Sequence, residues 1–259
     1  MNKVILESKN QVGTIILNDP RHLNALSAEL VDDIIAGLEE FRNKNVRTII
    51  IRAQKNVKIW SAGHDVRELP TGTLDPLTYA DPLRKVCREL HDYPKPVIAL
   101  IEGSVWGGAC ELIMSCDMIY ASEESTFAIT PAKLGVPYNI QGILNFMNSI
   151  PMHLLKEMLF TAQPISAEKA EVSGMISGVI KMEDLEEHVN KIAGFIVNNS
   201  PLSISVMKEG LKVLSEAFPM NPEAFEKIQA GRRVVYNSDD YKEGIRSFFE
   251  KRKPVFKGN

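Results

Sequence analysis

Apolar residues in the first half of the chain form short continuous runs separated by longer stretches with helical spacing. The runs are rich in Val and Ile and predict strands at 4–6, 12–17, 48–51, 97–101 and 118–121, of which the first two form a hairpin. Between them, apolar residues recur every three or four positions, which predicts helices. Strands that alternate with helices predict an α/β fold.

Capping signals place the starts of several helices. Ser27 precedes a stretch with an apolar face and is the expected N-cap of that helix. Asp81 is followed by Pro82, a residue tolerated in the first turn, so a second helix is expected there. A third helix is expected from about 108 to 115, after a glycine-rich turn that follows the strand at 97–101.

The chain from about residue 152 onward is predicted to be mostly helical. One amphipathic stripe contains Leu185, Val189 and Ile192, a further helix is expected to start at 221–223, and the last spans about 239–252. Apolar faces in this region pack either against the rest of the chain or against another subunit.

Composition narrows the class of protein. The chain has 259 residues, 44% of them hydrophobic, and a net charge of −3, which favours a globular protein over a nucleic-acid or membrane-surface binder. No uninterrupted apolar run is long enough to cross a bilayer, and the N-terminus lacks the apolar stretch of a signal peptide. The three cysteines, Cys87, Cys110 and Cys116, have apolar neighbours and predict free thiols in a reducing cytoplasm, and no zinc-ligand spacing is present.

Two segments of small residues, about forty positions apart, carry the candidate chemistry: 61–65 (SAGHD) and 103–111 (GSVWGGACE). Small residues let the backbone approach a ligand closely, and the first N–H groups of the helix near Gly108 have no partner within the helix. If the two segments converge, their N–H groups form an oxyanion hole. Each segment alone is also compatible with an ordinary turn, in which His64 is satisfied locally and Asp65 caps the chain that follows.

In combination, these segments resemble the crotonase (enoyl-CoA hydratase/isomerase) superfamily. Further matching positions cover nearly the whole chain: 24–26, 94–99, 116–117, 125–127, 134–135 and 250–254. The resemblance implies an α/β spiral of ββα units with a helical C-terminal region. It also implies an acyl-CoA substrate, no separate cofactor or metal, and a cytoplasmic homotrimer or dimer of trimers with neither a nucleic-acid nor a membrane partner.

The same resemblance assigns roles to residues. It gives the two oxyanion donors as the amides of His64 and Gly108, and it places Lys251 at the CoA phosphates. It divides the chain into a core with the CoA site at 1–195 and a region for oligomerisation and for covering that site at 196–259. The expected CoA path includes Ala62, Gly63, His64, Asp65 and Val66.

Hydratases of this family use two glutamates, and only one has a counterpart in this chain. The first matches Glu111, which remains a possible acid/base group, whereas Pro131 occupies the place of the second. Proline cannot carry a proton, so paired-carboxylate hydration is disfavoured. An isomerase or hydratase that uses Glu111 alone, and a non-catalytic CoA-binding protein, remain as alternatives.

Three positions resemble decarboxylating members of the family: His64, Trp106 and Tyr138. The resemblance implies that Tyr138 binds a substrate carboxylate and that Thr130 lies beside the acyl group. We expect Trp106 and Ile140 to form apolar walls. The expected reaction is decarboxylation of methylmalonyl-CoA, or of a close malonyl-CoA analogue, to propionyl-CoA through a thioester enolate.

Overall fold

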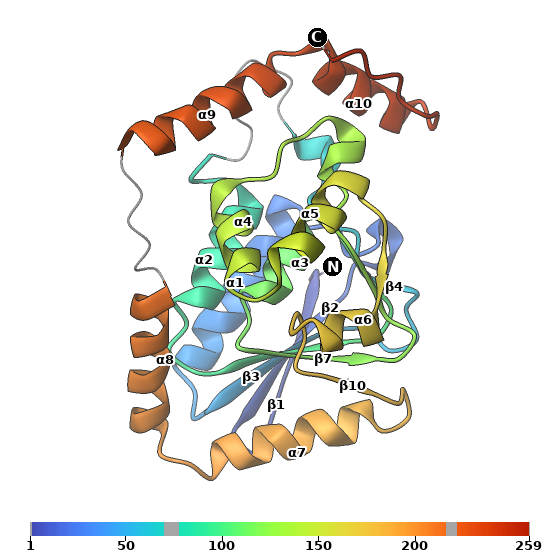
Figure 1. Ribbon diagram of the computed structural model, residues 1–259. Coiled ribbons are helices and arrows are strands. Elements are labelled where there is room, and N and C mark those ends of the chain that lie inside the picture. Colours follow the sequence, from blue (N-terminus) through green and yellow to red (C-terminus); the bar gives the residue numbers. More distant parts are fainter. Residues whose placement is uncertain (1, 70–77, 216–221, 259) are drawn as a thin grey trace.

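The computed structural model describes residues 2–69, 78–215 and 222–258. Two sheets lie in the first two thirds of the chain, and helices surround them (Figure 1). The strands are β1 (Val4–Lys9), β2 (Val12–Leu17), β3 (Thr48–Ala53), β4 (Ile59–Ser61), β5 (Val97–Ile101), β6 (Ser104–Trp106), β7 (Met118–Ser122), β8 (Thr126–Ala128), β9 (Ile165–Ser166) and β10 (Gly178–Ile180).

Ten α-helices and three 3₁₀ turns are present among the described residues. The helices are α1 (Ala28–Arg42), α2 (Pro82–His91), α3 (Gly108–Met114), α4 (Ile140–Met147), α5 (Met152–Thr161), α6 (Ala167–Val172), α7 (Leu185–Val197), α8 (Pro201–Ser215), α9 (Pro222–Tyr236) and α10 (Asp239–Phe249). The turns are η1 (Pro20–His22), η2 (Val66–Glu68) and η3 (Pro131–Leu134). Ser27 and Asp81 cap α1 and α2 as expected.

The larger sheet has the strand order β1-β2-β3-β5-β7-β10, antiparallel at the β1–β2 hairpin and parallel elsewhere. Its central strands β3 and β5 are buried along their whole length and mostly apolar, because both faces of the sheet are covered there. In β3, Ile49 and Ile51 point into the main core, whereas Ile50 packs with Leu185 and Val189 of α7 on the opposite face. Figure 1 shows α7 running across this second face.

The smaller sheet has the order β4-β6-β8-β9, in which β4, β6 and β8 are parallel. Strand β6 corrects the sequence prediction, which expected a glycine turn leading directly to a helix. Gly103 makes a sharp turn with φ of +94°, and three residues then pair with β4 and β8 before α3 begins. The short strands β9 and β10 likewise interrupt a region that was expected to be mostly helical. Strands of two or three residues are too short to show a period of two.

The C-terminal helices pack on different parts of the molecule. Tyr236 of α9 and Tyr241 of α10 form a small buried cluster with Val136, just after η3. By contrast, α8 exposes several large apolar side chains: Leu202, Val206, Met207, Leu211 and Leu214. Helix α9 starts at Pro222, and the predicted start at Asn221 lies outside the described residues. The division between 195 and 196 stays a prediction.

The three cysteines are free thiols: Cys87 and Cys110 are buried and Cys116 is half-buried. No helix within 2–69, 78–215 and 222–258 is long and apolar enough to cross a membrane. Over the same ranges, no group of three or more acidic, His or Cys side chains is arranged to hold a metal ion.

Candidate active site

The two glycine-containing segments meet because they follow neighbouring parallel strands. In β4 and β6, Ser61 is opposite Val105, and β8 lies on the other side of β6. The carboxyl ends of parallel strands lie at one edge of a sheet. The residues after β4, β6 and β8 therefore share this edge, which brings 62–66, 107–111 and 130–138 together.

The amides of His64 and Gly108 lie close to one point. A methyl carbon added at Gly108 would stand 3.3 Å from the amide nitrogen of His64, so one atom can lie near both nitrogens. Gly63 has φ of +86°, and a Cβ there would be 2.7 Å from the nitrogen of Gly108. Among the backbone hydrogen bonds between described residues, neither amide has an acceptor. Two unused donors at one point are free to bind the same ligand atom.

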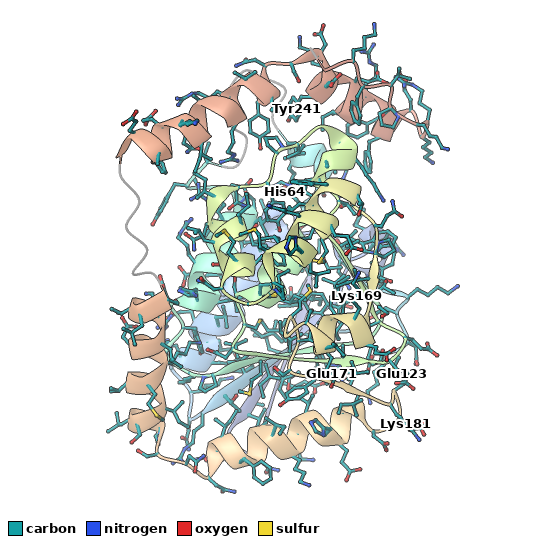
Figure 2. The ribbon with its side chains drawn as sticks, viewed as in Figure 1. His64, Glu123, Lys169, Glu171, Lys181 and Tyr241 are labelled. Atoms are coloured by element: carbon teal, nitrogen blue, oxygen red, sulfur yellow. The ribbon has the colours of Figure 1, made fainter. Side chains whose placement is uncertain are left out.

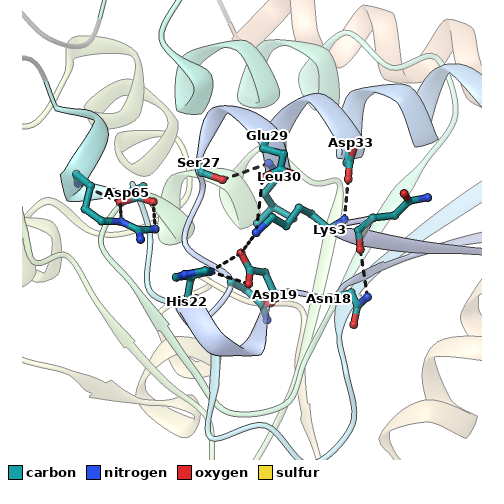
Figure 3. A network of polar contacts seen from close by, with 12 residues as sticks. Lys3, Asn18, Asp19, His22, Ser27, Glu29, Leu30, Asp33 and Asp65 are labelled. Carbon is teal, nitrogen blue, oxygen red and sulfur yellow. Dashed lines mark hydrogen bonds and ion pairs between the residues drawn. The ribbon is translucent and has the colours of Figure 1, made fainter.

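The first amide segment is held by the turn at 23–26. Asn24 donates from Nδ2 to the carbonyl of Trp60 at 2.9 Å, and Leu26 donates its N–H to the carbonyl of Gly63 at 2.8 Å. Asp19 holds the side chain of Asn24 in place, because the N–H of Asp19 donates to Oδ1 of Asn24 at 2.8 Å. Figure 3 shows the carboxylate of Asp19 between Lys3 and His22.

A cavity of about 80 Å³ opens beside the two amides. Seven of the predicted site residues line it: Ala62, His64, Val66, Gly108, Glu111, Thr130 and Tyr138. Gly63 and Asp65 belong to the same segment but do not line the cavity. Asp65 caps η2, as the sequence predicted, and it also pairs with Arg67. Lys251 is exposed and does not line this cavity.

The apolar walls differ from the expectation. Trp106 and Ile140 are not among the lining residues, and the walls come instead from Leu69, Leu83, Pro131, Leu134, Val136 and Pro137. Trp106 is 37% exposed because successive side chains of a strand point to opposite faces and Val105 takes the buried one. In Figure 2, His64 lies in the interior of the molecule, on the side toward Tyr241.

Glu111 is a buried carboxyl group with a strongly perturbed pKa. Burial raises its pKa to about 7, although Asn139 donates to Oε2 at 2.7 Å and opposes this shift. Asn139 is itself fixed, because its Oδ1 caps α4 by accepting from the N–H of Gly142 at 2.8 Å. A Cβ at Gly142 would stand 2.7 Å from Oε2 of Glu111 and would overlap the ring of Tyr138, so only glycine leaves room here.

The hydroxyl of Tyr138 is buried and makes no hydrogen bond of good geometry among the described residues, although the carboxyl group of Glu111 lies close enough for the two groups to shift each other's pKa. Burial raises the pKa of Tyr138 well above the usual value, and the nearby Glu111 carboxylate raises it further. A buried hydroxyl without a partner costs free energy, so such groups are rare unless a ligand satisfies them. Tyr138 itself lines the cavity, and its hydroxyl oxygen has almost no accessible surface in this state.

Residues 7–259 match the enoyl-CoA hydratase/isomerase family. The chain belongs to this family. Over 250 residues it is 48% identical to methylmalonyl-CoA decarboxylase of Escherichia coli (strain K12), with 96% of each chain covered. A solved structure of methylmalonyl-CoA decarboxylase complexed with 2S-carboxypropyl CoA superposes with a TM-score of 0.98 at 47% identity, covering 100% of this chain and 99% of that one. Another, in complex with 2-nitronate-propionyl-CoA, gives a TM-score of 0.97 at 47% identity, covering 99% of each.

These similarities confirm the crotonase fold expected from the sequence motifs. In this enoyl-CoA hydratase/isomerase family member, the sequence did not predict that Asn139 and Asp81 contact residues of the site. Each has a local signal, because each is an N-cap residue, and Asp81 was identified as one. Their second contacts, to Glu111 and to His64, join residues that are far apart in the sequence and leave no periodic pattern.

Proposed function

We propose that this protein decarboxylates methylmalonyl-CoA to propionyl-CoA through a thioester enolate. The observation that carries the proposal is the composition of the cavity. It combines the amides of His64 and Gly108 with a buried unpaired hydroxyl on Tyr138, and Glu111 is the one carboxyl group among its described lining residues. The 48% identity to a methylmalonyl-CoA decarboxylase supports the same reaction.

The two amides act on the charge that the reaction creates. When the C–C bond to the substrate carboxylate breaks, its electron pair moves toward the thioester carbonyl, CO₂ leaves, and the carbonyl oxygen becomes an enolate oxygen. Donors at His64 and Gly108 bind that oxygen more strongly as its charge grows, which is the condition for catalysis. Gly108 is the first residue of α3, so the helix dipole adds to this stabilisation.

Tyr138 supplies the orientation. A hydrogen bond from its hydroxyl to the substrate carboxylate holds the breaking bond perpendicular to the thioester plane, so that its electrons enter the carbonyl π system. Thr130 lies beside Gly107 at the same edge, where a Cβ on Gly107 would be 3.0 Å from its hydroxyl oxygen. The small volume and the apolar walls suit a short acyl group such as methylmalonyl.

Glu111 suits this reaction because it is partly neutral at pH 7. With a pKa of about 7, it carries a proton in about half of the molecules at neutral pH and then does not repel the substrate carboxylate. The enolate carbon finally takes one proton, from Glu111 or from water. The thioester takes up the electron pair itself, so the proposed reaction uses no cofactor.

We also infer that the protein acts in the cytoplasm as a homotrimer or a dimer of trimers. The apolar side chains that α8 exposes suit an interface between copies of the chain. Within this assembly Lys251 is proposed to reach the CoA phosphates.

The experiment is to incubate the protein with methylmalonyl-CoA and, separately, with crotonyl-CoA, and to measure product masses. We expect propionyl-CoA from the first and no product from the second. Hydration or isomerisation of crotonyl-CoA without decarboxylation would instead identify a Glu111-dependent hydratase or isomerase. Turnover of neither compound would indicate a non-catalytic CoA-binding protein.

A matched pair of variants tests the oxyanion donor itself. Gly108→Ala keeps the amide but adds a methyl group 2.6 Å from Leu83 Cδ2, whereas Gly108→Pro adds similar bulk and removes the N–H. Proline is tolerated at the first position of a helix, so α3 should still form. Loss of one such donor costs roughly 100- to 1000-fold in kcat, so we expect the Pro variant to be slower than the Ala variant by that factor. The carbon added in both variants also lies 3.3 Å from the amide nitrogen of His64, so the comparison requires that Gly108→Ala keep measurable activity. Equal measurable rates would then remove the amide of Gly108 from the mechanism.

A further inference from the structure

The imidazole ring of His64 is bonded in a way that its backbone role does not require. Nδ1 lies 3.1 Å from the carbonyl oxygen of Asp65, and Nε2 lies 2.8 Å from Oδ2 of Asp81. A carbonyl oxygen and an ionised carboxylate oxygen accept hydrogen bonds and do not donate them. Each ring nitrogen therefore donates a proton, and the ring with both protons is an imidazolium cation.

The carboxylate of Asp81 is held on both sides. Its Oδ1 caps α2 by accepting from the N–H groups of Leu83 at 3.0 Å and Arg84 at 3.3 Å, which leaves Oδ2 for His64. The side chain of Asp81 is 4% exposed, and that of His64 is 12% exposed. Because the helix start fixes the carboxylate, the carboxylate fixes the orientation of the ring.

The other charged groups around the ring also favour the cation. Burial alone would lower the pKa of His64, but its hydrogen bond to Asp81 and the charge of that carboxylate raise the pKa above its usual value, and Glu68 adds to this. The carboxylate of Asp65 is paired with Arg67 and acts on the ring mainly through its backbone carbonyl. These groups therefore shift the protonation equilibrium of the ring toward the cation, in agreement with its two hydrogen-bond acceptors.

Of the two members of this ion pair, the histidine is the one at the cavity. His64 lines the cavity, whereas Asp81 does not. During decarboxylation, negative charge moves from the substrate carboxylate to the thioester oxygen beside the amide of His64. A cation on the same residue therefore stabilises the enolate more than it stabilises the bound substrate.

We propose that the side chain of His64 is an electrostatic catalytic group of the oxyanion hole, and that Asp81 is the positioning residue that holds it there as a cation. This inference rests on the proposed decarboxylase function and extends it. In it, residue 64 acts twice, through its N–H and through its ring, and a glycine or alanine at this position would supply only the first contribution.

The test is Asp81→Asn. Asparagine caps helices as well as aspartate does, so α2 should keep its start. Its Nδ2 would donate to Nε2 of His64, which leaves the ring hydrogen-bonded but neutral. The change removes the imidazolium together with the carboxylate that pairs with it, so the cavity loses the nearer charge of an ion pair and not a net charge. We therefore expect kcat at pH 7.5 to fall by a few-fold to about tenfold, with KM changed much less.

The pH profile separates this role from a structural one. The profiles are measured in a Glu111→Gln background, because the charge of Asp81 also raises the pKa of Glu111. There, kcat should fall as pH rises through the raised pKa of His64, and adding Asp81→Asn should move this descending limb to lower pH. Asp32→Asn is the matched control, because Asp32 also pairs with α2, through Lys85 at 2.7 Å, but at an exposed site. It should keep the profile of the Glu111→Gln parent. An unchanged profile in Asp81→Asn would overturn the proposal.

Nitrogen-15 NMR of the ring, assigned with a His64→Gln sample, gives a readout that does not depend on turnover. We expect an imidazolium at pH 7 in the wild type and a neutral ring in Asp81→Asn. A neutral His64 ring in the wild type would overturn the inference, even if Asp81→Asn failed to fold. If the wild type did not decarboxylate methylmalonyl-CoA, the proposed function would fail, and an imidazolium signal would still identify the ion pair.

Discussion

Tyr138→Phe should make the protein more stable and much less active. The phenol hydroxyl is buried and unpaired among the described residues, whereas the ring packs in a T-shaped contact with Phe146 at 6.0 Å between centroids. Leaving a buried hydroxyl unsatisfied costs roughly 1–3 kcal/mol. Phenylalanine keeps the ring contact and removes this cost, so we expect the free energy of unfolding to rise by about 1 kcal/mol.

The same change removes the proposed contact to the substrate carboxylate. A hydrogen bond to a charged group contributes roughly 1.5–3 kcal/mol, which corresponds to a loss of about 10- to 100-fold in kcat/KM. Affinity for propionyl-CoA, which lacks the carboxylate, should change little. Urea unfolding gives the stability, and mass detection of propionyl-CoA gives the rate.

Tyr93→Phe is the matched control for this prediction. Tyr93 is also buried, but its hydroxyl donates to the carbonyl of Leu38 at 2.9 Å, and neither residue lines the cavity. Its loss should lower the free energy of unfolding by about 1 kcal/mol and leave kcat unchanged. If Tyr138→Phe were also destabilised, or if it decarboxylated at the wild-type rate, the hydroxyl would not have the role assigned to it.

Two further predictions concern the pKa of Glu111 and the packing of α10. The pKa of Glu111 is about 7 in the folded protein and 4.5 for the free group. As pH rises, the unfolded chain therefore loses this proton at a lower pH than the folded protein does. The free energy of unfolding of the wild type consequently falls between these two pH values. Glu111→Gln should therefore unfold with a free energy about 3 kcal/mol higher than the wild type at pH 8 and within about 1 kcal/mol of it at pH 5, in urea titrations at both pH values. A difference independent of pH would contradict the raised pKa. Gly244→Ala would place a methyl group against the carbonyl of Leu134 in η3 and should lower the free energy of unfolding by about 1–3 kcal/mol. Gly210→Ala is the control, because the added carbon in α8 has nothing within 4 Å, and it should raise the free energy of unfolding by about 0.5–1 kcal/mol. If thermal melts showed both variants shifted in the same direction, this packing argument would be refuted.

Local patterns in the sequence determine the main elements and the residues of the two amides. The apolar runs predict β2, β3, β5 and β7, because each of these strands contains consecutive apolar residues, and β3 and β5 are buried along their whole length. Capping residues predict the starts of α1 and α2, because a cap acts only on the next few residues. Family motifs identify His64, Gly108 and Glu111 as site residues, and the fold brings them to one cavity.

The tertiary structure alone decides what surrounds those residues. Trp106 was expected to form a wall and instead lies outside the cavity lining, because the three-residue strand β6 fixes which side chain points inward. The pairing of β4 with β6, in which Ser61 is opposite Val105, brings the two amides together. The contacts of Asp81 with His64 and of Asn139 with Glu111 likewise span 17 and 28 positions of the chain. Such contacts depend on how whole helices and strands pack together, so the pattern of neighbouring residues in the sequence does not predict them.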